Sequence, residues 1–205
     1  MLDKILNVRF LGALGESVGQ SLGLRKPRPA QLTGQSLYAA AVAQSRQVPF
    51  YTDYGVADEI GARFELLVLH VVMLINGLKS DDAQAQETSQ ALFDTLLQAL
   101  DDTLREQGVG DLTVPKKMKK LGQEVYTRLV RWDDLWNQDA DVEAQADYLR
   151  RTVYAGQEEA VDLPLWSNAL SHYIMETRSG LSVDELLQGR AVWAPLSVPQ
   201  VKEIE

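Results

Sequence analysis

The segment that most constrains the fold reads GARFELLVLHVVMLINGL and runs from Gly61 to Leu78. Between Leu66 and Ile75 every residue except His70 is apolar, so no face of a helix or strand in this run can remain in water. A membrane span needs about 20 mostly apolar residues, and the uninterrupted run is about half that length. We therefore expect a buried central helix near residues 58–78 in a soluble domain.

The size and charge of the chain narrow the classes of protein to which it can belong. Its 205 residues suit one well-packed domain. A net charge of -9 and a pI near 4.8 argue against a general nucleic-acid-binding protein, so we expect no DNA partner. Any polyanion would need a local basic patch. The absence of cysteine excludes disulfides, thiolate nucleophiles and cysteine-based metal sites.

Helical periodicity continues along most of the remaining chain. Apolar residues recur three and four positions apart in segments that begin at capping residues or prolines. These segments run from Thr33 to near Pro49, from Ser80 to Gly108, from Pro115 past Trp136, from Asp139 to near Gly156, from Pro164 past Ile174 and from Ser182 to Gly189. No neighbouring runs of alternating β-branched residues are joined by hairpin turns. The sequence therefore predicts an all-α fold, a single globular domain of about six to eight helices around the central one.

The two ends of the chain differ from this helical domain, which we place at residues 31–190. Residues 1–30 hold an amphipathic extension, with apolar residues every four positions from Leu2 to Leu22, and a Pro-rich linker. The extension either packs on the domain or frays, or it rests on a membrane surface or a partner. Residues 191–205 are expected to form an irregular tail. Because the N-terminus lacks a secretory pattern, we expect a cytoplasmic protein.

Residues that could support catalysis or hold a metal are sparse. The segment Gly15–Gly19 matches the G-x-S-x-G motif of serine hydrolases, but a helical stripe passes through it and no α/β alternation surrounds it. His70 and His172 lie on different predicted helices, and His172 with Glu176 would supply only two metal ligands. We therefore expect no enzyme, no catalytic residues, no metal and no cofactor. His70 is either a neutral core histidine or a polar contact at a partner groove.

The clearest candidate for a binding surface is the run Lys116-Lys117-Met118-Lys119-Lys120, which Arg128 and Arg131 extend along the same helix. Lysines in the first turns of a helix oppose its dipole, which favours anions there, so local stability does not explain them. The run is either an ordinary solvated helix face or a contact for an anionic partner. Such a partner would be lipid headgroups, ribosomal RNA or an acidic protein surface.

Two blocks of the sequence carry a recognisable pattern. The first is PFYTDYGVAD at residues 49–58 followed by GARFELLVLH at residues 61–70, and the second is GVGDL at residues 108–112 followed by VPKKMKK at residues 114–120. Together they resemble the ubiquinol-cytochrome c chaperone family, the assembly factors of the respiratory cytochrome bc1 complex. With looser similarity on both sides, the resemblance covers roughly Leu37 to Gly156.

The resemblance implies an all-helical, non-enzymatic chaperone that binds nascent or newly inserted cytochrome b and promotes bc1 assembly. Mitochondrial relatives of this family act near the ribosomal exit with a small partner protein, and the resemblance leaves open whether this chain does so. We hypothesise that a client groove is edged by Phe50, Tyr51, Tyr54, Asp58, Arg63 and His70. The anionic partner, a membrane surface or the ribosome, would contact Lys116, Lys117, Lys119, Lys120 and Arg128.

A second function class uses the same lysines without a respiratory client. In this alternative the chain is a cytoplasmic helical module that associates with the ribosome or RNA through its basic helix. The chaperone interpretation places the protein in the cytoplasm or peripherally on the inner face of the cytoplasmic membrane. Loss of cytochrome b with normal translation in a deletion strain would favour the chaperone, and the reverse would favour the alternative.

Overall fold

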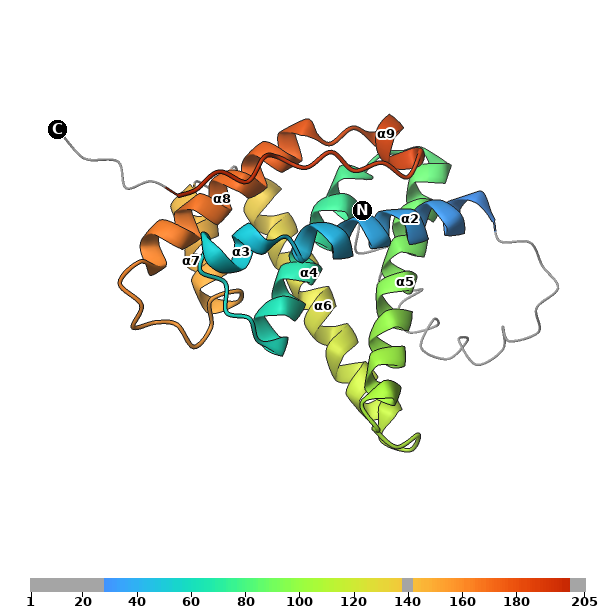
Figure 1. The fold of residues 1–205 in the computed structure, drawn as a ribbon. Helices are drawn as coiled ribbons and strands as arrows, with labels where there is room; N and C mark the ends of the chain where they lie inside the picture. Colours follow the sequence, from blue (N-terminus) through green and yellow to red (C-terminus); the bar gives the residue numbers. More distant parts are fainter. Residues whose placement is uncertain (1–27, 138–141, 200–205) are drawn as a thin grey trace.

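A computed structural model of the chain describes residues 28–137 and 142–199, which fold into eight α-helices and no strand (Figure 1). The helices are α2 (Pro29–Ser45), α3 (Val48–Thr52), α4 (Ile60–Gly77), α5 (Ala83–Glu106), α6 (Val114–Asn137), α7 (Val142–Arg151), α8 (Leu163–Gly180) and α9 (Val183–Leu187). The predicted all-α single domain is confirmed. The predicted N-terminal amphipathic extension lies outside the described residues, apart from the end of its linker.

Helix α4 lies at the centre of the fold. Every residue from Leu66 to Ile75 except Leu67 is buried, and α2, α5, α6 and α8 all pack against this helix. In the described part of the chain, α4 is the one helix long and apolar enough to cross a membrane. Its neighbours cover it instead, because an all-round apolar helix gains most when other helices remove it from water.

Helices α5 and α6 form a hairpin that projects from the other helices (Figure 1). Asp82 caps α5, since its carboxylate accepts a hydrogen bond from the amide of Ala85 at 2.8 Å. The predicted apolar stripe of α6 is buried at Met118, Val125 and Leu129 and continues through its tryptophans. The turn between the two helices lies at the far end of this hairpin (Figure 1).

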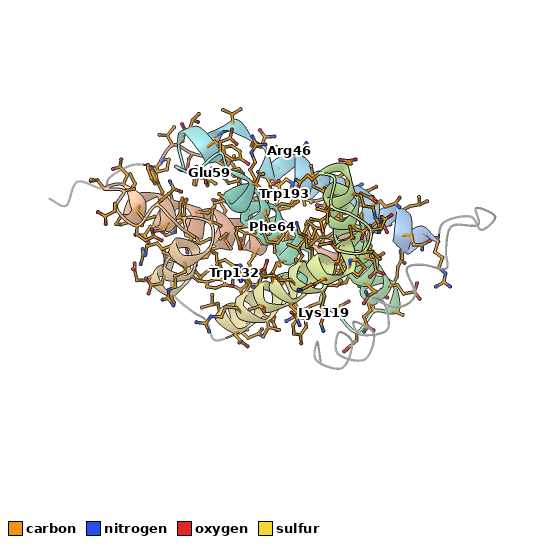
Figure 2. The ribbon with its side chains drawn as sticks, turned by 90° about the horizontal axis from the view of Figure 1, so that it is seen from below. Arg46, Glu59, Phe64, Lys119, Trp132 and Trp193 are labelled. Carbon is orange, nitrogen blue, oxygen red and sulfur yellow. The ribbon has the colours of Figure 1, made fainter. Side chains whose placement is uncertain are left out.

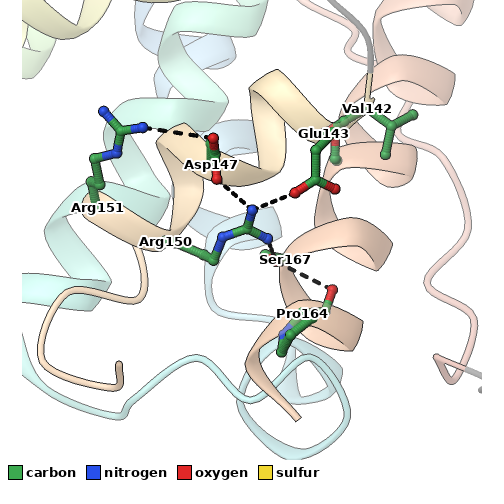
Figure 3. Close-up of polar contacts among 8 residues, drawn as sticks. Val142, Glu143, Asp147, Arg150, Arg151, Pro164 and Ser167 are labelled. Atoms are coloured by element: carbon green, nitrogen blue, oxygen red, sulfur yellow. Dashed lines mark hydrogen bonds and ion pairs between the residues drawn. The ribbon is translucent and has the colours of Figure 1, made fainter. Parts of the chain in front are cut away.

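Helices α7 and α8 form the other end of the molecule and are joined by a polar cluster around Arg150 (Figure 3). The guanidinium of Arg150 donates to Glu143 at 2.6 Å and to the Ser167 hydroxyl on α8 at 3.0 Å, and it also pairs with Asp147. The Ser171 hydroxyl donates to the Val142 carbonyl at 3.1 Å. Side chains and backbone therefore both attach the short α7 to α8.

Several element boundaries differ from the sequence expectation. Helix α2 begins at Pro29 rather than after Thr33, because proline suits the first helical position and the Gln31 side chain accepts from the Arg28 amide. Part of the expected aromatic turn is the short helix α3. Residues 190–199 have no regular secondary structure, yet they return along α8 and place Trp193 against the core (Figure 1).

Candidate functional site

His70 lies at the centre of a buried hydrogen-bond chain. Its Nδ1 lies 2.7 Å from the Leu66 carbonyl oxygen, which can only accept, so Nδ1 carries the proton. Its Nε2, 3.0 Å away, then accepts from the Tyr173 hydroxyl, whose oxygen in turn accepts from Gln44 at 3.1 Å. Burial lowers the pKa of His70 from 6.5 to about 4. The side chain is therefore a neutral, fully bonded core histidine.

Aromatic rings from separate segments surround this imidazole. Phe50 packs edge-on against His70 and Tyr173 at 5.3 Å in each case. Trp193 meets the imidazole at 5.1 Å from the C-terminal segment, and Tyr54 lies 5.7 Å from Phe50. The hypothesis that Phe50, Tyr54 and His70 edge a client groove therefore needs correction, because all three are buried. These rings pack closely against one another, and such contacts stabilise the fold more in the core than at the surface.

The chain turns into this core at Gly55. Its φ of 64° lies in the left-handed region, and a Cβ on it would lie 2.2 Å from the Trp166 ring. Next to it, the buried Tyr154 hydroxyl donates to the Tyr54 carbonyl at 2.8 Å. Gln157 donates to the Gly55 carbonyl at 2.9 Å. The first resemblance block is therefore held from α8 and from the turn before it.

The other three members of the predicted client groove are accessible. Tyr51 is partly exposed, and Asp58 and Arg63 are exposed and form an ion pair. The Arg63 guanidinium lies 5.7 Å from the centre of the Tyr51 ring, so the Arg63 side chain reaches from the start of α4 to α3. On the same two helices Val48 and Ile60 are largely exposed. We call Val48, Tyr51, Asp58, Ile60 and Arg63 the α3–α4 edge.

The four lysines of the second block are all exposed. At about 100° per residue, Lys116 and Lys120 lie opposite the buried Met118, and Lys117 and Lys119 flank them. The salt bridge found for this group within the described chain joins Lys120 to Glu124 at 3.7 Å, and the Lys120 side chain is 80% exposed. In Figure 2, Lys119 lies on α6 at the opposite edge of the molecule from Arg46.

Arg128 does not belong to this exposed group. It makes two hydrogen bonds to the Glu65 carboxylate, at 2.8 and 2.6 Å, and the two side chains are only 22% and 15% exposed. The bound carboxylate raises the pKa of Arg128. Its charge is already used to join α6 to α4, and the expectation that Arg128 contacts an anionic partner stays a prediction.

The turn between α5 and α6 presents an apolar side chain that the sequence analysis missed. The amide of Gly108, at φ 77°, donates to the Arg105 carbonyl, and the amide of Val109 donates to the Leu104 carbonyl. These two bonds are the Schellman arrangement that ends a helix. Beyond it, the Leu112 side chain is 99% exposed. The sequence feature that could have predicted this exposure is the position of Leu112 between a Gly-rich turn and the Val-Pro start of a helix. We call residues 108–120 the hairpin tip.

The accessible chemistry of the described residues is that of binding surfaces. No three histidine, aspartate or glutamate side chains within residues 28–137 and 142–199 are placed to hold a metal ion. The tyrosines nearest to His70 are also withdrawn from solution, and burial raises the pKa of Tyr173. Two surfaces remain from the sequence hypotheses: the α3–α4 edge, which is apolar with one ion pair, and the hairpin tip, which combines a leucine with lysines.

Comparisons with known proteins agree with the resemblance. The family model described as ubiquinol-cytochrome C chaperone matches residues 52–193. The crystal structure of the Cbp3 homolog from Brucella abortus is similar, with a TM-score of 0.70 and 27% sequence identity. That similarity covers 85% of this chain and 94% of the Brucella chain. A search of curated proteins gave no match.

Proposed function

The chain belongs to the ubiquinol-cytochrome c chaperone family, and on this basis we propose that it is a non-enzymatic chaperone for assembly of the bc1 complex. Its client is newly made cytochrome b, which it binds on the cytoplasmic side of the membrane. The observation that carries the proposal is the family match over residues 52–193, which includes the second resemblance block and all of the first except residues 49–51.

The α3–α4 edge supports a client of this kind. Newly made cytochrome b exposes apolar helices, and a chaperone for it needs accessible apolar side chains that its own fold does not use. Val48 and Ile60 are such side chains, with 66% and 78% of their surface exposed. Tyr51 and Arg63 beside them offer an aromatic ring and a charge for polar parts of the client. This edge takes the place of the groove hypothesised from the sequence.

Photo-crosslinking from position 51 tests the client directly. A photoreactive residue replaces Tyr51 in the full chain in cells, and captured proteins are identified by mass spectrometry. We expect cytochrome b to be captured from position 51. His172, exposed on α8, is the control position and should capture none. Capture of ribosomal proteins alone from position 51 would instead support the alternative of a ribosome-associated or RNA-associated module.

A surface substitution tests the same edge without disturbing the fold. Ile60→Asp places an acid at the first residue of α4, where the helix dipole favours negative charge, so the chain should fold normally. We expect the spectroscopic cytochrome b signal of cells to fall severalfold. Val161→Asp alters an apolar side chain elsewhere that is 93% exposed, and it is the control. Normal cytochrome b in the Ile60→Asp strain would remove the edge from the proposal, and normal cytochrome b after gene deletion would remove the function.

A further inference from the structure

We propose that the hairpin tip docks the protein on a bilayer containing anionic lipids, with Leu112 in the interfacial layer and the four lysines on the headgroup phosphates. This docking concerns a different surface from the α3–α4 edge and does not require a client. It assigns a specific binding partner, the anionic bilayer, to the lysines at the start of α6. The observations that support it are the exposure of Leu112, the arrangement of charge around it and the projection of the hairpin.

Leu112 is held outward by an ordered turn. Asp111, its neighbour, accepts from Arg105 of α5 at 2.6 Å, and the Thr113 amide donates to the Gly110 carbonyl at 2.7 Å. With the helix-ending bonds at Gly108 and Val109, these contacts fix the backbone on both sides of the leucine. A turn that is already ordered loses little conformational entropy when it enters a lipid interface. In water, by contrast, the apolar surface of Leu112 stays hydrated and contributes no stabilisation.

The charges at the tip suit an anionic surface. Lys116, Lys117 and Lys119 have no salt bridge to any residue in the described ranges, so their ammonium groups are available. The acids on the adjacent end of α5 are Asp101, Asp102 and Glu106, and Asp101 is bonded to Arg105 together with Asp111. From Val114 to Gln123 α6 carries no acid at all. Lysines near an anionic membrane each contribute about 1 kcal/mol of attraction.

The charge and shape of the rest of the molecule determine how the protein is oriented on the bilayer. The whole chain carries a net charge of -9, so most of its surface is repelled by an anionic bilayer. The hairpin tip projects beyond the other helices in Figure 1, so it can touch a flat surface while the acidic body stays away. Docking by the tip therefore leaves the α3–α4 edge uncovered.

The same features favour lipid over RNA. Single-stranded RNA is bound by basic grooves together with aromatic or arginine side chains that stack on bases. Residues 107–120 contain neither an aromatic residue nor an arginine. An exposed leucine gains nothing from a phosphate backbone, whereas a lipid interface stabilises it by removing its apolar surface from water.

A single-cysteine label reports insertion at the proposed point. The chain contains no cysteine, so Leu112→Cys can be labelled with an environment-sensitive dye in the full chain. Vesicles of phosphatidylcholine and phosphatidylglycerol in equal parts should increase and blue-shift the emission, and pure phosphatidylcholine should have little effect. Val161→Cys, at a valine that is 93% exposed, is the control and should not respond. Because the label is local, binding by the N-terminal extension alone would leave it unchanged and would contradict the proposal.

A matched pair of charge reversals tests the lysines. Lys116→Glu with Lys120→Glu should weaken binding to the mixed vesicles by about 25-fold or more, because each removed lysine costs about fivefold. Arg46→Glu with Arg151→Glu changes the net charge equally at exposed sites, at the ends of α2 and α7 and away from the tip, and should weaken vesicle binding less than twofold. Equal weakening by both pairs, or competition by poly(U) RNA with no vesicle binding, would overturn the proposal. These measurements use purified protein, so they can fail while the cytochrome b experiments succeed, and the reverse also holds.

Discussion

The two resemblance blocks occupy opposite environments in the fold. The first, residues 49–58 with the start of α4, turns inward at Gly55 and contributes Phe50 and Tyr54 to the rings around His70. The second, residues 108–120, forms an ordered turn and a helix start whose lysines and Leu112 face solvent. The buried residues of the first block therefore build the core, whereas the lysines and Leu112 of the second block, like the accessible Tyr51, Asp58 and Arg63 of the first, are presented to solvent.

This difference means that the residues that identify the family are not all residues that contact partners. A family pattern can contain residues that build the core and residues that contact partners, and the sequence alone does not distinguish them. Substitutions at the buried residues of the first block should therefore act through stability, whereas substitutions at the exposed lysines and Leu112 of the second should act on binding with stability unchanged. Any variant that reverses this assignment would break the comparison.

Gly55→Ala should produce the largest loss of stability. The left-handed backbone disfavours alanine by about 1–2 kcal/mol, and the clash with the Trp166 ring adds about 1–3 kcal/mol or more. Gly108→Ala is the matched control, because its φ of 77° carries the same backbone penalty but nothing lies within 4 Å of the new Cβ. Urea unfolding should show a clearly larger loss for Gly55→Ala. Equal losses would mean that Trp166 does not confine this turn.

The buried His70 should make stability fall as the pH is lowered. Its pKa is about 4 in the folded chain and 6.5 when exposed, so the unfolded chain binds more protons between these values. The contribution is fully present above pH 6.5, is lost progressively down to pH 4 and amounts to about 3 kcal/mol. His70→Gln should flatten this part of the pH profile measured by urea unfolding. His172→Gln, at the exposed histidine, is the matched substitution control, and identical slopes for His70→Gln and wild type would contradict the assignment.

The sequence predicts the position of a residue only where that residue type has a single favourable environment, buried or exposed. The apolar run through α4 predicted the central helix because burial was its only favourable state. The lysines were predicted to be exposed because four unpaired ammonium groups cannot be buried. Phe50, Tyr54 and Arg128 could not be assigned in this way. An aromatic ring is stable in a core or at an interface, and Arg128 was withdrawn by Glu65, a partner distant in sequence.

Arg128→Gln should lower stability without affecting docking. The substitution removes a two-bond contact between α4 and α6 and leaves the Glu65 carboxylate, only 15% exposed, without its cation. We expect a loss of about 2 kcal/mol in urea unfolding. Lys120→Gln is the control, since its partner Glu124 is 3.7 Å away and the pair is exposed, and it should lose less than about 0.5 kcal/mol. A loss of vesicle binding by Arg128→Gln equal to that of the lysine variants would return Arg128 to the basic surface.

The smallest expected change in stability belongs to Lys116→Glu with Lys120→Glu. Both side chains are exposed at the beginning of α6, where the helix dipole favours acids over lysines. Stability should therefore stay the same or rise by about 0.5 kcal/mol, although vesicle binding falls. A residue type that the local helix disfavours, and whose removal does not destabilise the fold, has to be explained by something outside the chain. If urea unfolding instead showed a loss above about 1 kcal/mol, these lysines would have a structural role, and the contrast between the two blocks would no longer hold.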